Sequence, residues 1–187
     1  GAFLTTAADG KQNTMTIGWG SLGFKWGQPT FTVMVRQSRY TKELIDANPE
    51  FTVSFPVKEG FAQALGLCGS KSGRDLDKFE ATGLTREKAS TVNVPLVKES
   101  PVNIECKVTQ VLELGSHDMF LAKVTAVQVD ESLLDEKGKL DLNKAHLVAY
   151  SHGEYFALAK AFKKPRKWYR EHSKDEAIEI LKLEAKK

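Results

Sequence analysis

The stretch at residues 18–23, GWGSLG, decides between two kinds of fold for this chain. It matches the G-x-G-x-x-G pattern of dinucleotide-binding Rossmann folds, in which the glycines end a strand and begin a helix that receives a pyrophosphate. Here Gly27 and Pro29 would break such a helix, and residues 30–35 (TFTVMV) have the β-branched and aromatic content of a strand. The context therefore argues against a Rossmann fold, and the glycines need another explanation.

The segment at residues 13–20, NTMTIGWG, is predicted to be one strand whose side chains alternate between two faces. The faces then hold Asn13, Met15, Ile17 and Trp19 on one side and Thr14, Thr16, Gly18 and Gly20 on the other. The second face is small or hydroxylated, and glycine inside a strand marks a bulge or a close approach by another backbone or a ligand. Two interpretations stay open: a flat slot for a planar heteroaromatic ligand, or a bulged strand at a barrel corner.

Length and charge limit the possible functions. The 187 residues suit one domain, and no run of eighteen apolar residues is present, so we expect a cytoplasmic protein without a membrane partner. The net charge of +3 comes from residues 160–187, which hold ten Lys and Arg against five Asp and Glu. The rest of the chain offers no basic run interleaved with aromatics, which argues against a nucleic-acid partner. The basic segment is predicted to be a solvated helical tail or a subunit-packing arm.

Side-chain sets for hydrolysis, group transfer or metal binding are not recognisable in the sequence. Cys68 and Cys106 are the only cysteines, and they form neither a C-x-x-C pair nor a zinc set. The four histidines show no ligand spacing, so no metal site is predicted. If the protein is a redox catalyst, a cofactor must supply the chemistry.

The order of elements predicts a mainly β protein with short helices. The expected strands are residues 2–8, 13–21, 30–37, 51–56, 102–114, 119–131, 145–150 and 154–158. Asp9–Gly10 and residues 115–118 are expected as hairpin turns, and residues 41–48 and 60–71 as helices. About seven strands joined mostly by short hairpins indicate an antiparallel barrel. From residue 160 an amphipathic stripe of Ile178, Leu181 and Ala185 predicts a helix.

Two loops have the composition of anion-binding segments. In residues 36–41 (RQSRYT), Ser38 or Thr41 is expected to cap the following helix, and Arg39 adds a guanidinium. Residues 68–79 (CGSKSGRDLDKF) are rich in glycine and hydrogen-bond donors. An ordinary capped helix and a mobile surface loop are the alternatives. Cys68, beside the second loop, fits a buried structural thiol. Together with the strand beside Trp19, the loops suggest a ligand with a flat end and a phosphate end.

Four segments, in this order, resemble the flavin reductase-like, FMN-binding split-barrel family, and most of all its flavoredoxins. They are DGKQNTMTIGWGS (9–21), RQSRYTKELIDANPEFTVSFP (36–56), GSKSGRDLDKF (69–79) and SHDMFLAKV (116–124). The resemblance implies an antiparallel Greek-key split β-barrel over residues 1–158, and the basic helical tail expected at 159–187 lies beyond it. It also implies a homodimer that holds FMN non-covalently.

By matching positions, the resemblance also implies a set of FMN-binding residues. Those implied for the isoalloxazine and ribityl chain are Asn13, Thr14, Met15 and Thr16, with Trp19 in the pocket. Those implied for the phosphate are Arg39, Tyr40, Thr41, Ser70, Lys71, Ser72 and Arg74. Ser54 and Phe55 would supply backbone contacts, Tyr150 would lie near the ring, and Lys78 and His117 would approach the flavin. Positive charge at Lys78 and His117 would stabilise the anionic reduced flavin, and His117 is the sole catalytic candidate.

The expected function is FMN-dependent electron transfer from a reduced donor, either NAD(P)H or a redox partner protein, to an acceptor. The alternative is a non-enzymatic split-barrel module that holds another anionic ligand, or haem, as a dimer.

Overall fold

The computed structural model describes residues 1–187 apart from 57–60, 142, 146–147, 152–153, 158–175 and 177–187. Its centre is one seven-stranded antiparallel sheet with the strand order β2-β1-β5-β8-β9-β4-β3. The strands are β1 (Ala2–Ala8), β2 (Lys11–Ile17), β3 (Gly20–Lys25), β4 (Gln28–Arg36), β5 (Glu50–Phe55), β8 (Val102–Glu113) and β9 (His117–Val129).

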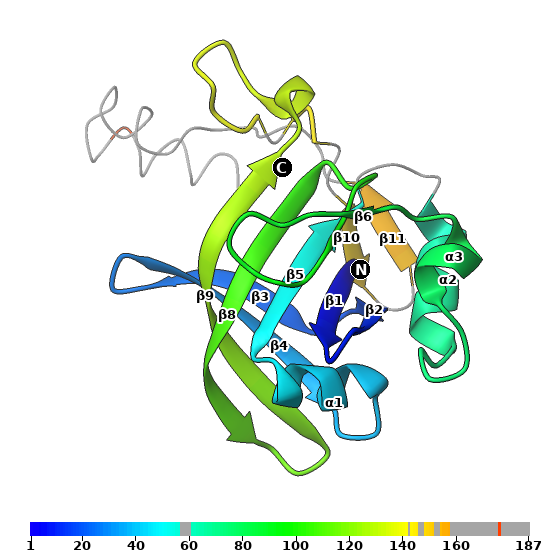
Figure 1. The fold of residues 1–187 in the computed structure, drawn as a ribbon. Coiled ribbons are helices and arrows are strands. Elements are labelled where there is room, and N and C mark those ends of the chain that lie inside the picture. The colour runs from blue at the N-terminus through cyan, green and yellow to red at the C-terminus, as the bar shows by residue number, and fades with distance from the viewer. Residues whose placement is uncertain (57–60, 142, 146–147, 152–153, 158–175, 177–187) are drawn as a thin grey trace.

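The sheet curls into a barrel that stays open along one side (Figure 1). Strands β2 and β3 are the two ends of the sheet, yet only Gly18 and Trp19 separate them in sequence. The two end strands must therefore approach each other, and the Met34 amide donates to the Trp19 carbonyl at 3.1 Å near that seam. The predicted antiparallel split barrel is confirmed.

The seam between β2 and β3 explains one of the three glycines of the G-x-G-x-x-G match at residues 18–23. The prediction of one strand over residues 13–21 was wrong, because β2 ends at Ile17 and the chain bends before β3, which was not predicted. A Cβ at Gly20 would lie 2.9 Å from the Thr32 carbonyl oxygen, closer than real Cβ atoms come, whereas Gly18 and Gly23 have nothing within 4 Å. Of the three motif glycines, only Gly20 is required by a close backbone approach.

The hairpin turns follow local sequence. Asp9 and Gly10 have φ of 50° and 75°, the left-handed pair of a type I′ turn, as predicted. In the β8–β9 hairpin, Gly115 has φ of 79°. The predicted turn extends two residues too far, because His117 and Asp118 already belong to β9, where His117 pairs with Arg36 of β4.

The barrel interior and the helix-covered face form separate apolar clusters. Inside the barrel, Phe31 and Phe51 pack edge to face at 6.3 Å beside Cys106. Burial, with a smaller effect of Glu105, raises the pKa of the Cys106 thiol to about 12. Cys68 is buried in the second cluster, and burial raises the pKa of its thiol as well, although Lys78 opposes this.

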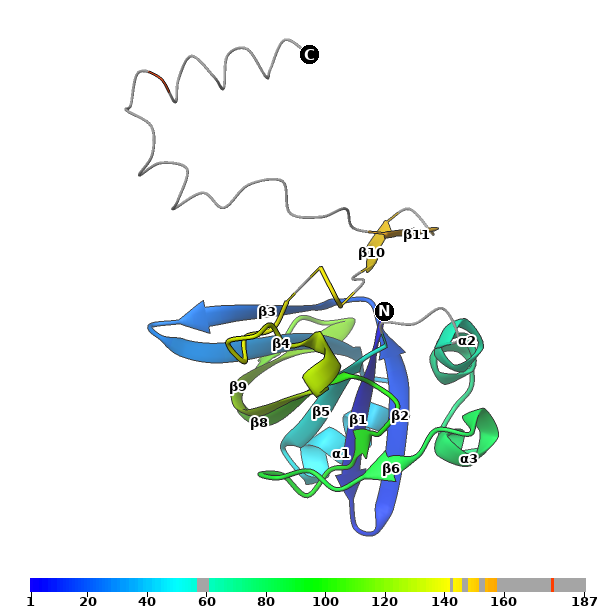
Figure 2. The same cartoon turned by 90° about the horizontal axis from the view of Figure 1, so that it is seen from above.

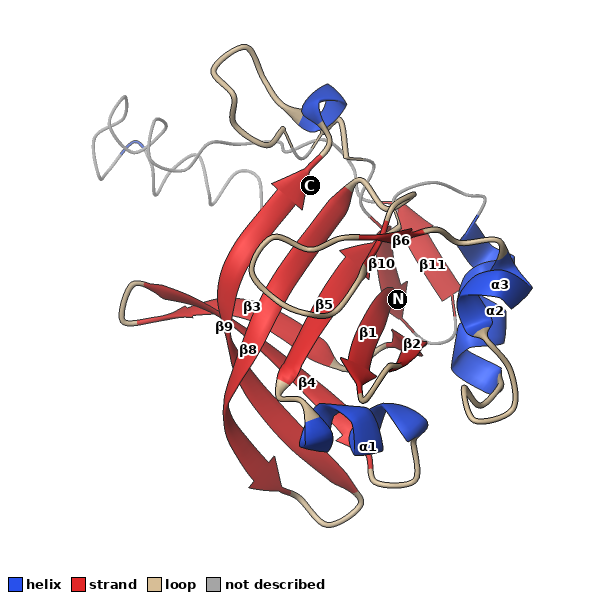
Figure 3. Cartoon of the chain, in the orientation of Figure 1, coloured by secondary structure: helices blue, strands red, loops and turns tan. Residues whose placement is uncertain are grey.

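Three helices cover the barrel (Figure 3). Helix α1 (Tyr40–Ala47) closes one end, and α2 (Ala62–Ser70) lies with α3 (Lys78–Thr82) beside the free edge of β2. The smaller elements are β6 (Arg86–Glu87), β7 (Leu96–Val97), the 3-10 helix η2 (Glu131–Leu133), β10 (Val148–Ser151) and β11 (Glu154–Ala157). Of all these, α1, α2, β10 and β11 were predicted. Among the described residues, no helix is long and apolar enough to cross a membrane.

The predicted basic tail lies outside the described residues, apart from Glu176.

Candidate functional site

A small cavity of about 160 Å³ lies where β2, the start of α1 and the α2–α3 connection meet. Its lining is mostly polar and comes from the two loops that the sequence singled out, plus one strand. The lining residues are Asn13, Met15, Ser38, Arg39, Tyr40, Thr41, Ser70, Lys71, Ser72, Gly73, Arg74 and Lys78. Sequence reasoning had named all of these as site residues except Ser38, expected as a cap, and Gly73, which was not separated from its loop.

Asn13 is one of the buried polar residues of the cavity. Its Nδ2 donates to Thr41 Oγ1 at 2.8 Å and so connects β2 to α1. Its Oδ1 is also buried and has no hydrogen-bond partner among the described residues. A Cβ at Gly73 would collide with this Oδ1 and come within 3.1 Å of Tyr40, so only glycine lets the loop pass so close.

Four basic side chains line the cavity, those of Arg39, Lys71, Arg74 and Lys78, and two of them lie close together. Lys78 is only 5% exposed, and its Nζ donates to the Cys68 carbonyl at 2.9 Å. Arg39 lies nearby, with Nη1 3.4 Å from the Gly69 carbonyl. Burial lowers the pKa of Lys78, and the neighbouring charge of Arg39 lowers it further. No carboxylate belongs to the described lining of the cavity, so an incoming anion would stabilise the buried ammonium beside its second cation.

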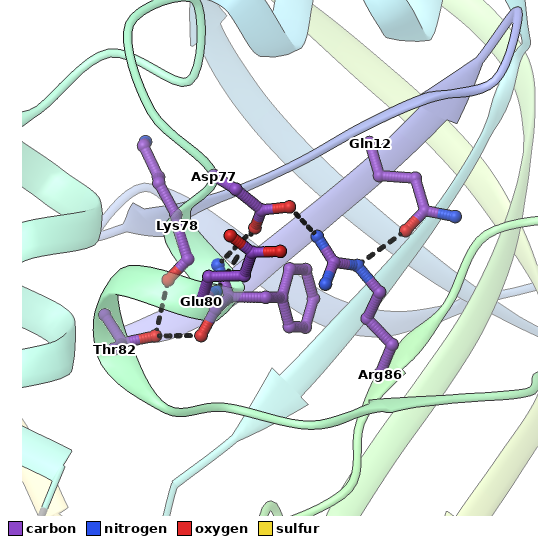
Figure 4. A network of polar contacts seen from close by, with 7 residues as sticks. Gln12, Asp77, Lys78, Glu80, Thr82 and Arg86 are labelled. Carbon is purple, nitrogen blue, oxygen red and sulfur yellow. Dashed lines mark hydrogen bonds and ion pairs between the residues drawn. The ribbon is translucent and has the colours of Figure 1, made fainter.

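A network of polar contacts fixes the residue before Lys78 (Figure 4). Asp77 caps α3 by accepting hydrogen bonds from the Phe79 amide at 2.9 Å and the Glu80 amide at 3.3 Å. Burial alone would raise the pKa of Asp77, but these amides and an ion pair with Arg86 outweigh it and lower the pKa. The cap holds the first turn of α3, and with it Lys78, in place.

Arg86 extends this network to β2. Its guanidinium forms the ion pair with Asp77, and its Nε donates to Gln12 Oε1 at 2.8 Å. The guanidinium also lies 4.4 Å from the centroid of the Phe79 ring. Helix α3 is therefore joined to the strand that carries Asn13.

The start of α1 differs from its prediction. Neither Ser38 nor Thr41 caps the helix: the N-cap position is Arg39, which makes no side-chain capping bond. Thr41 Oγ1 is used by Asn13 instead, and an uncapped first turn presents backbone N–H groups without intrahelical partners. Arg74 crosses from the other loop, donating to the Ser38 carbonyl at 3.3 Å and lying 5.3 Å from the Tyr40 ring centroid.

The small-residue face of β2 is not the predicted ligand slot. Thr14 is fully buried and its hydroxyl accepts from Thr5 Oγ1 at 3.1 Å. Thr16 Oγ1 donates to the Leu65 carbonyl at 2.7 Å, because helix α2 packs on this side. The cavity lies instead on the face that Asn13 and Met15 share.

Trp19 and His117 come together away from this cavity. Their ring centroids are 4.9 Å apart, and His117 Nδ1 lies 2.9 Å from Ser116 Oγ. Trp19, which is 60% exposed, lines a separate hollow of about 330 Å³ with Met34 and Met119.

The remaining predicted residues lie elsewhere. Ser54 is buried and accepts from the Val97 amide at 3.3 Å, and the Phe55 ring packs 6.4 Å from that of Phe31. Neither lines the cavity. Tyr150 belongs to β10, and its side chain is outside the described part of the structure.

Comparison with known proteins assigns this arrangement to a family. Residues 2–159 match the flavin reductase like domain. The chain belongs to the flavin reductase-like family. This membership supports a flavin cofactor and a flavin-related redox function for the chain.

Two solved structures are similar to this chain in fold, and a third protein is similar to it in sequence. A flavoredoxin of Desulfovibrio vulgaris (Miyazaki F) is 30% identical, with a TM-score of 0.79 over 87% of this chain and 88% of that one. An FMN-binding protein of Thermus thermophilus is 28% identical, with a TM-score of 0.71 over 88% of both chains. An uncharacterised protein of Archaeoglobus fulgidus is 30% identical over 154 residues, covering 82% of this chain and 85% of that protein.

The cavity residues fit the phosphate end of a flavin nucleotide. The positive charges of Lys78 and Arg39 complement the negative charge of the phosphate. The uncapped start of α1 and the serine-rich α2–α3 connection offer hydrogen-bond donors to the phosphate oxygens. The cavity volume of about 160 Å³ suits a phosphate group and leaves the larger flavin ring outside it.

Proposed function

We propose that the protein binds FMN non-covalently and transfers electrons through it from a reduced donor to an acceptor. The observation that carries the proposal is the small polar cavity that buried Lys78, exposed Arg39 and buried Asn13 line together. A phosphate monoester would be the counter-ion for the positive charges of Lys78 and Arg39. Ser72 and the backbone of the α2–α3 connection would complete its hydrogen bonds.

The flavin ring would extend from the phosphate along β2 towards Met15. Strand β2 is an edge of the sheet, so one side of its backbone has no neighbouring strand to pair with. Residues 13–16 would then lie next to the ribityl chain and ring. The hydroxyls of Thr14 and Thr16 are already used inside the protein, so we propose backbone contacts for these two residues.

The bound flavin would supply the hydride and electron chemistry. Lys78, with its ammonium fixed by the Cys68 carbonyl, would hold the phosphate and so position the ring. Trp19 and the neighbouring His117 could act on the ring only if the ring, or that of a second subunit, reaches the hollow that Trp19 lines. The role of His117 as the catalytic candidate therefore stays a prediction.

We also propose a homodimer. Large apolar side chains are exposed on the β3–β4 hairpin, which projects from the barrel in Figure 2, with Phe24 79% and Trp26 99% exposed. The far part of the β8–β9 hairpin adds exposed Val111, Leu112 and Leu114. Covering these side chains with a second copy of the chain would remove apolar surface from water. Phe24→Glu should then convert a dimer into a monomer in light scattering, whereas a monomeric wild-type protein would refute the dimer.

The match to the flavin reductase like domain over residues 2–159 supports a redox domain at 1–158 and a separate basic tail from 159. The cytoplasmic location stays a prediction.

The first test is an absorbance spectrum of the purified protein, followed by FMN titration of any colourless fraction. Flavin bands, or stoichiometric uptake of FMN, would support the proposal. A protein that does not bind FMN would favour the alternative, a module for another anion or for haem. A Soret band in the absorbance spectrum would identify haem.

The electron donor can be found with the FMN-loaded protein under anaerobic conditions. Rapid bleaching of the flavin by NADH or NADPH would identify a reductase that uses a nicotinamide. Bleaching only by a reduced protein donor would identify an electron carrier, the role that the similarity to flavoredoxin suggests.

A further inference from the structure

The hollow beside Trp19 holds two of the three methionines of the chain. We call it the methionine hollow; it has a volume of about 330 Å³ and is lined by Trp19, Gly20, Ser21, Thr32, Met34 and Met119. The third methionine, Met15, lines the phosphate cavity instead. No charged side chain is among the described residues that line the methionine hollow.

Strand pairing brings the two thioether side chains to one point. Met34 of β4 is directly opposite Met119 of β9, so their Cβ atoms are about 4.5–5.5 Å apart and their side chains share a face. That face is the outside of the barrel, because the neighbouring Val33, Val35 and Phe120 are buried in its interior. Both methionines are half-buried, and their unbranched side chains are flexible. The two sulfur atoms can therefore reach one small ion that enters from solvent.

An imidazole lies beside these thioethers. His117 comes two residues before Met119 and shares its face of β9. The His117 ring centroid is 4.9 Å from that of Trp19, which supplies an aromatic ring for a cation to approach. His117 Nδ1 lies 2.9 Å from Ser116 Oγ, whereas Nε2 makes no hydrogen bond with the described residues. This leaves Nε2 available as a metal ligand.

The donor types select the kind of metal ion. Thioether sulfur favours soft ions such as Cu(I), whereas Mg²⁺ and Ca²⁺ prefer carboxylate and carbonyl oxygens. Among the described residues, no group of three or more histidine, cysteine or carboxylate side chains could hold a metal ion. The Asp118 carboxylate is buried and is paired with Lys42 at 3.1 Å, and the residue opposite His117 is the exposed Arg36. Without a carboxylate, the hollow suits a monovalent soft ion better than a divalent hard one.

We propose that Met34, Met119 and Nε2 of His117 form a binding site for Cu(I), with the Trp19 ring beside the ion. The site is independent of the proposed flavin function, because none of these four side chains lines the phosphate cavity.

The test is an NMR titration of the purified protein with isotope-labelled methionine methyl groups, using Ag(I) as a redox-inert substitute for Cu(I). The chain has three methionines and so gives three methyl signals, which single Met→Leu variants assign. We expect the Met34 and Met119 signals to shift together and to saturate at one equivalent of Ag(I), while the Met15 signal stays in place. Cu(I) under anaerobic reducing conditions should shift the same two signals, and Zn(II) should shift neither.

Variants measure the contribution of each ligand. Met34→Leu and Met119→Leu remove one sulfur each and nearly conserve volume, so the variants should fold. Each should weaken Ag(I) binding by at least about tenfold, because even residues that only orient metal ligands affect affinity by that factor. Met15→Leu is the matched control, since it removes the thioether that lies outside the methionine hollow and should leave Ag(I) affinity unchanged.

Three results would overturn the site. Ag(I) uptake that shifts neither the Met34 nor the Met119 signal would place the ion elsewhere, for instance on the thiol of Cys68 or Cys106. Equal Ag(I) affinity of Met34→Leu, Met119→Leu and the Met15→Leu control would show that the thioethers do not bind the ion. Zn(II) that binds as tightly as Ag(I) would indicate an ordinary histidine site. If a variant fails to fold, the wild-type titration decides alone, because its signals already separate the hollow from Met15.

Discussion

Replacing Lys78 by methionine tests the phosphate cavity directly. The side chain is 5% exposed and its ammonium is bound to one backbone carbonyl, that of Cys68, at 2.9 Å. A hydrogen bond to a charged group is worth about 1.5–3 kcal/mol. Since 1.4 kcal/mol is a factor of ten in affinity, losing the contact between the Lys78 ammonium and the phosphate should weaken FMN binding by roughly 10- to 150-fold.

The free protein should respond differently from the complex. Burial lowers the pKa of Lys78, which means that the empty cavity disfavours its charge. Methionine removes that unfavourable charge but also leaves the Cys68 carbonyl without its donor, a loss of about 1 kcal/mol. These effects oppose each other, so the free energy of unfolding of the apoprotein should change by less than about 1 kcal/mol.

The assay combines calorimetric FMN titration with urea unfolding of the same apoprotein. Lys88→Met is the matched control, because Lys88 is an exposed lysine away from the cavity. If Lys78→Met binds FMN as tightly as the control while remaining folded, the phosphate does not occupy this cavity. If both variants weaken binding equally, only the net charge matters and the local contact is refuted.

Three further predictions use the same site and the barrel seam. The pKa of Lys78 is lowered from 10.5 in the empty cavity, and a bound phosphate would raise it again. FMN affinity should therefore fall as pH rises through the lowered pKa. Calorimetry in buffers of different ionisation enthalpy should detect proton uptake on FMN binding in that pH range. Gly73→Ala should weaken FMN binding at least tenfold, because the added Cβ would push the buried side chain of Asn13 aside. Gly66→Ala is the control, because a Cβ at Gly66 meets nothing within 4 Å. Equal FMN affinity of the two variants would contradict the steric explanation. Gly20→Ala should lower the free energy of unfolding, measured in urea, by about 1–3 kcal/mol, because the added Cβ would meet the Thr32 carbonyl oxygen. Gly23→Ala should change it by less than about 1 kcal/mol. Equal effects of the two substitutions would refute the contact with Thr32 as the cause.

Local chemistry made most of the sheet predictable. The strand at residues 30–37 stands out by its β-branched and aromatic residues, and it forms β4 (Gln28–Arg36). Asp9–Gly10 is a turn signal because both residues tolerate positive φ. The two loops could be singled out by their density of donors and cations, and they meet at the cavity, where Arg39 contacts Gly69, 30 positions further along the sequence.

The failures arise where long-range packing decides. Nothing local to residues 13–20 shows that the sheet must curl between Ile17 and Gly20, so Trp19 was assigned to a strand although it lies in the bend between β2 and β3. A ligand slot was one of two interpretations of the small face at Thr16, but this face receives helix α2, whose Leu65 lies 49 positions further on. Helix α3 has only five residues, too few to show a periodic pattern, and its cap at Asp77 was the available signal.

Both thiols of the described chain are buried, with pKa values raised by that burial, to about 12 for Cys106. Oxidants attack the thiolate, not the thiol, and reach it only from solvent. Reduced flavins pass electrons to dioxygen, so a flavoprotein that works in air is exposed to the hydrogen peroxide it makes. With Cys68 and Cys106 both held protonated and covered, such a protein could turn over in air without sulfenylating itself, and its lifetime would be limited by other residues.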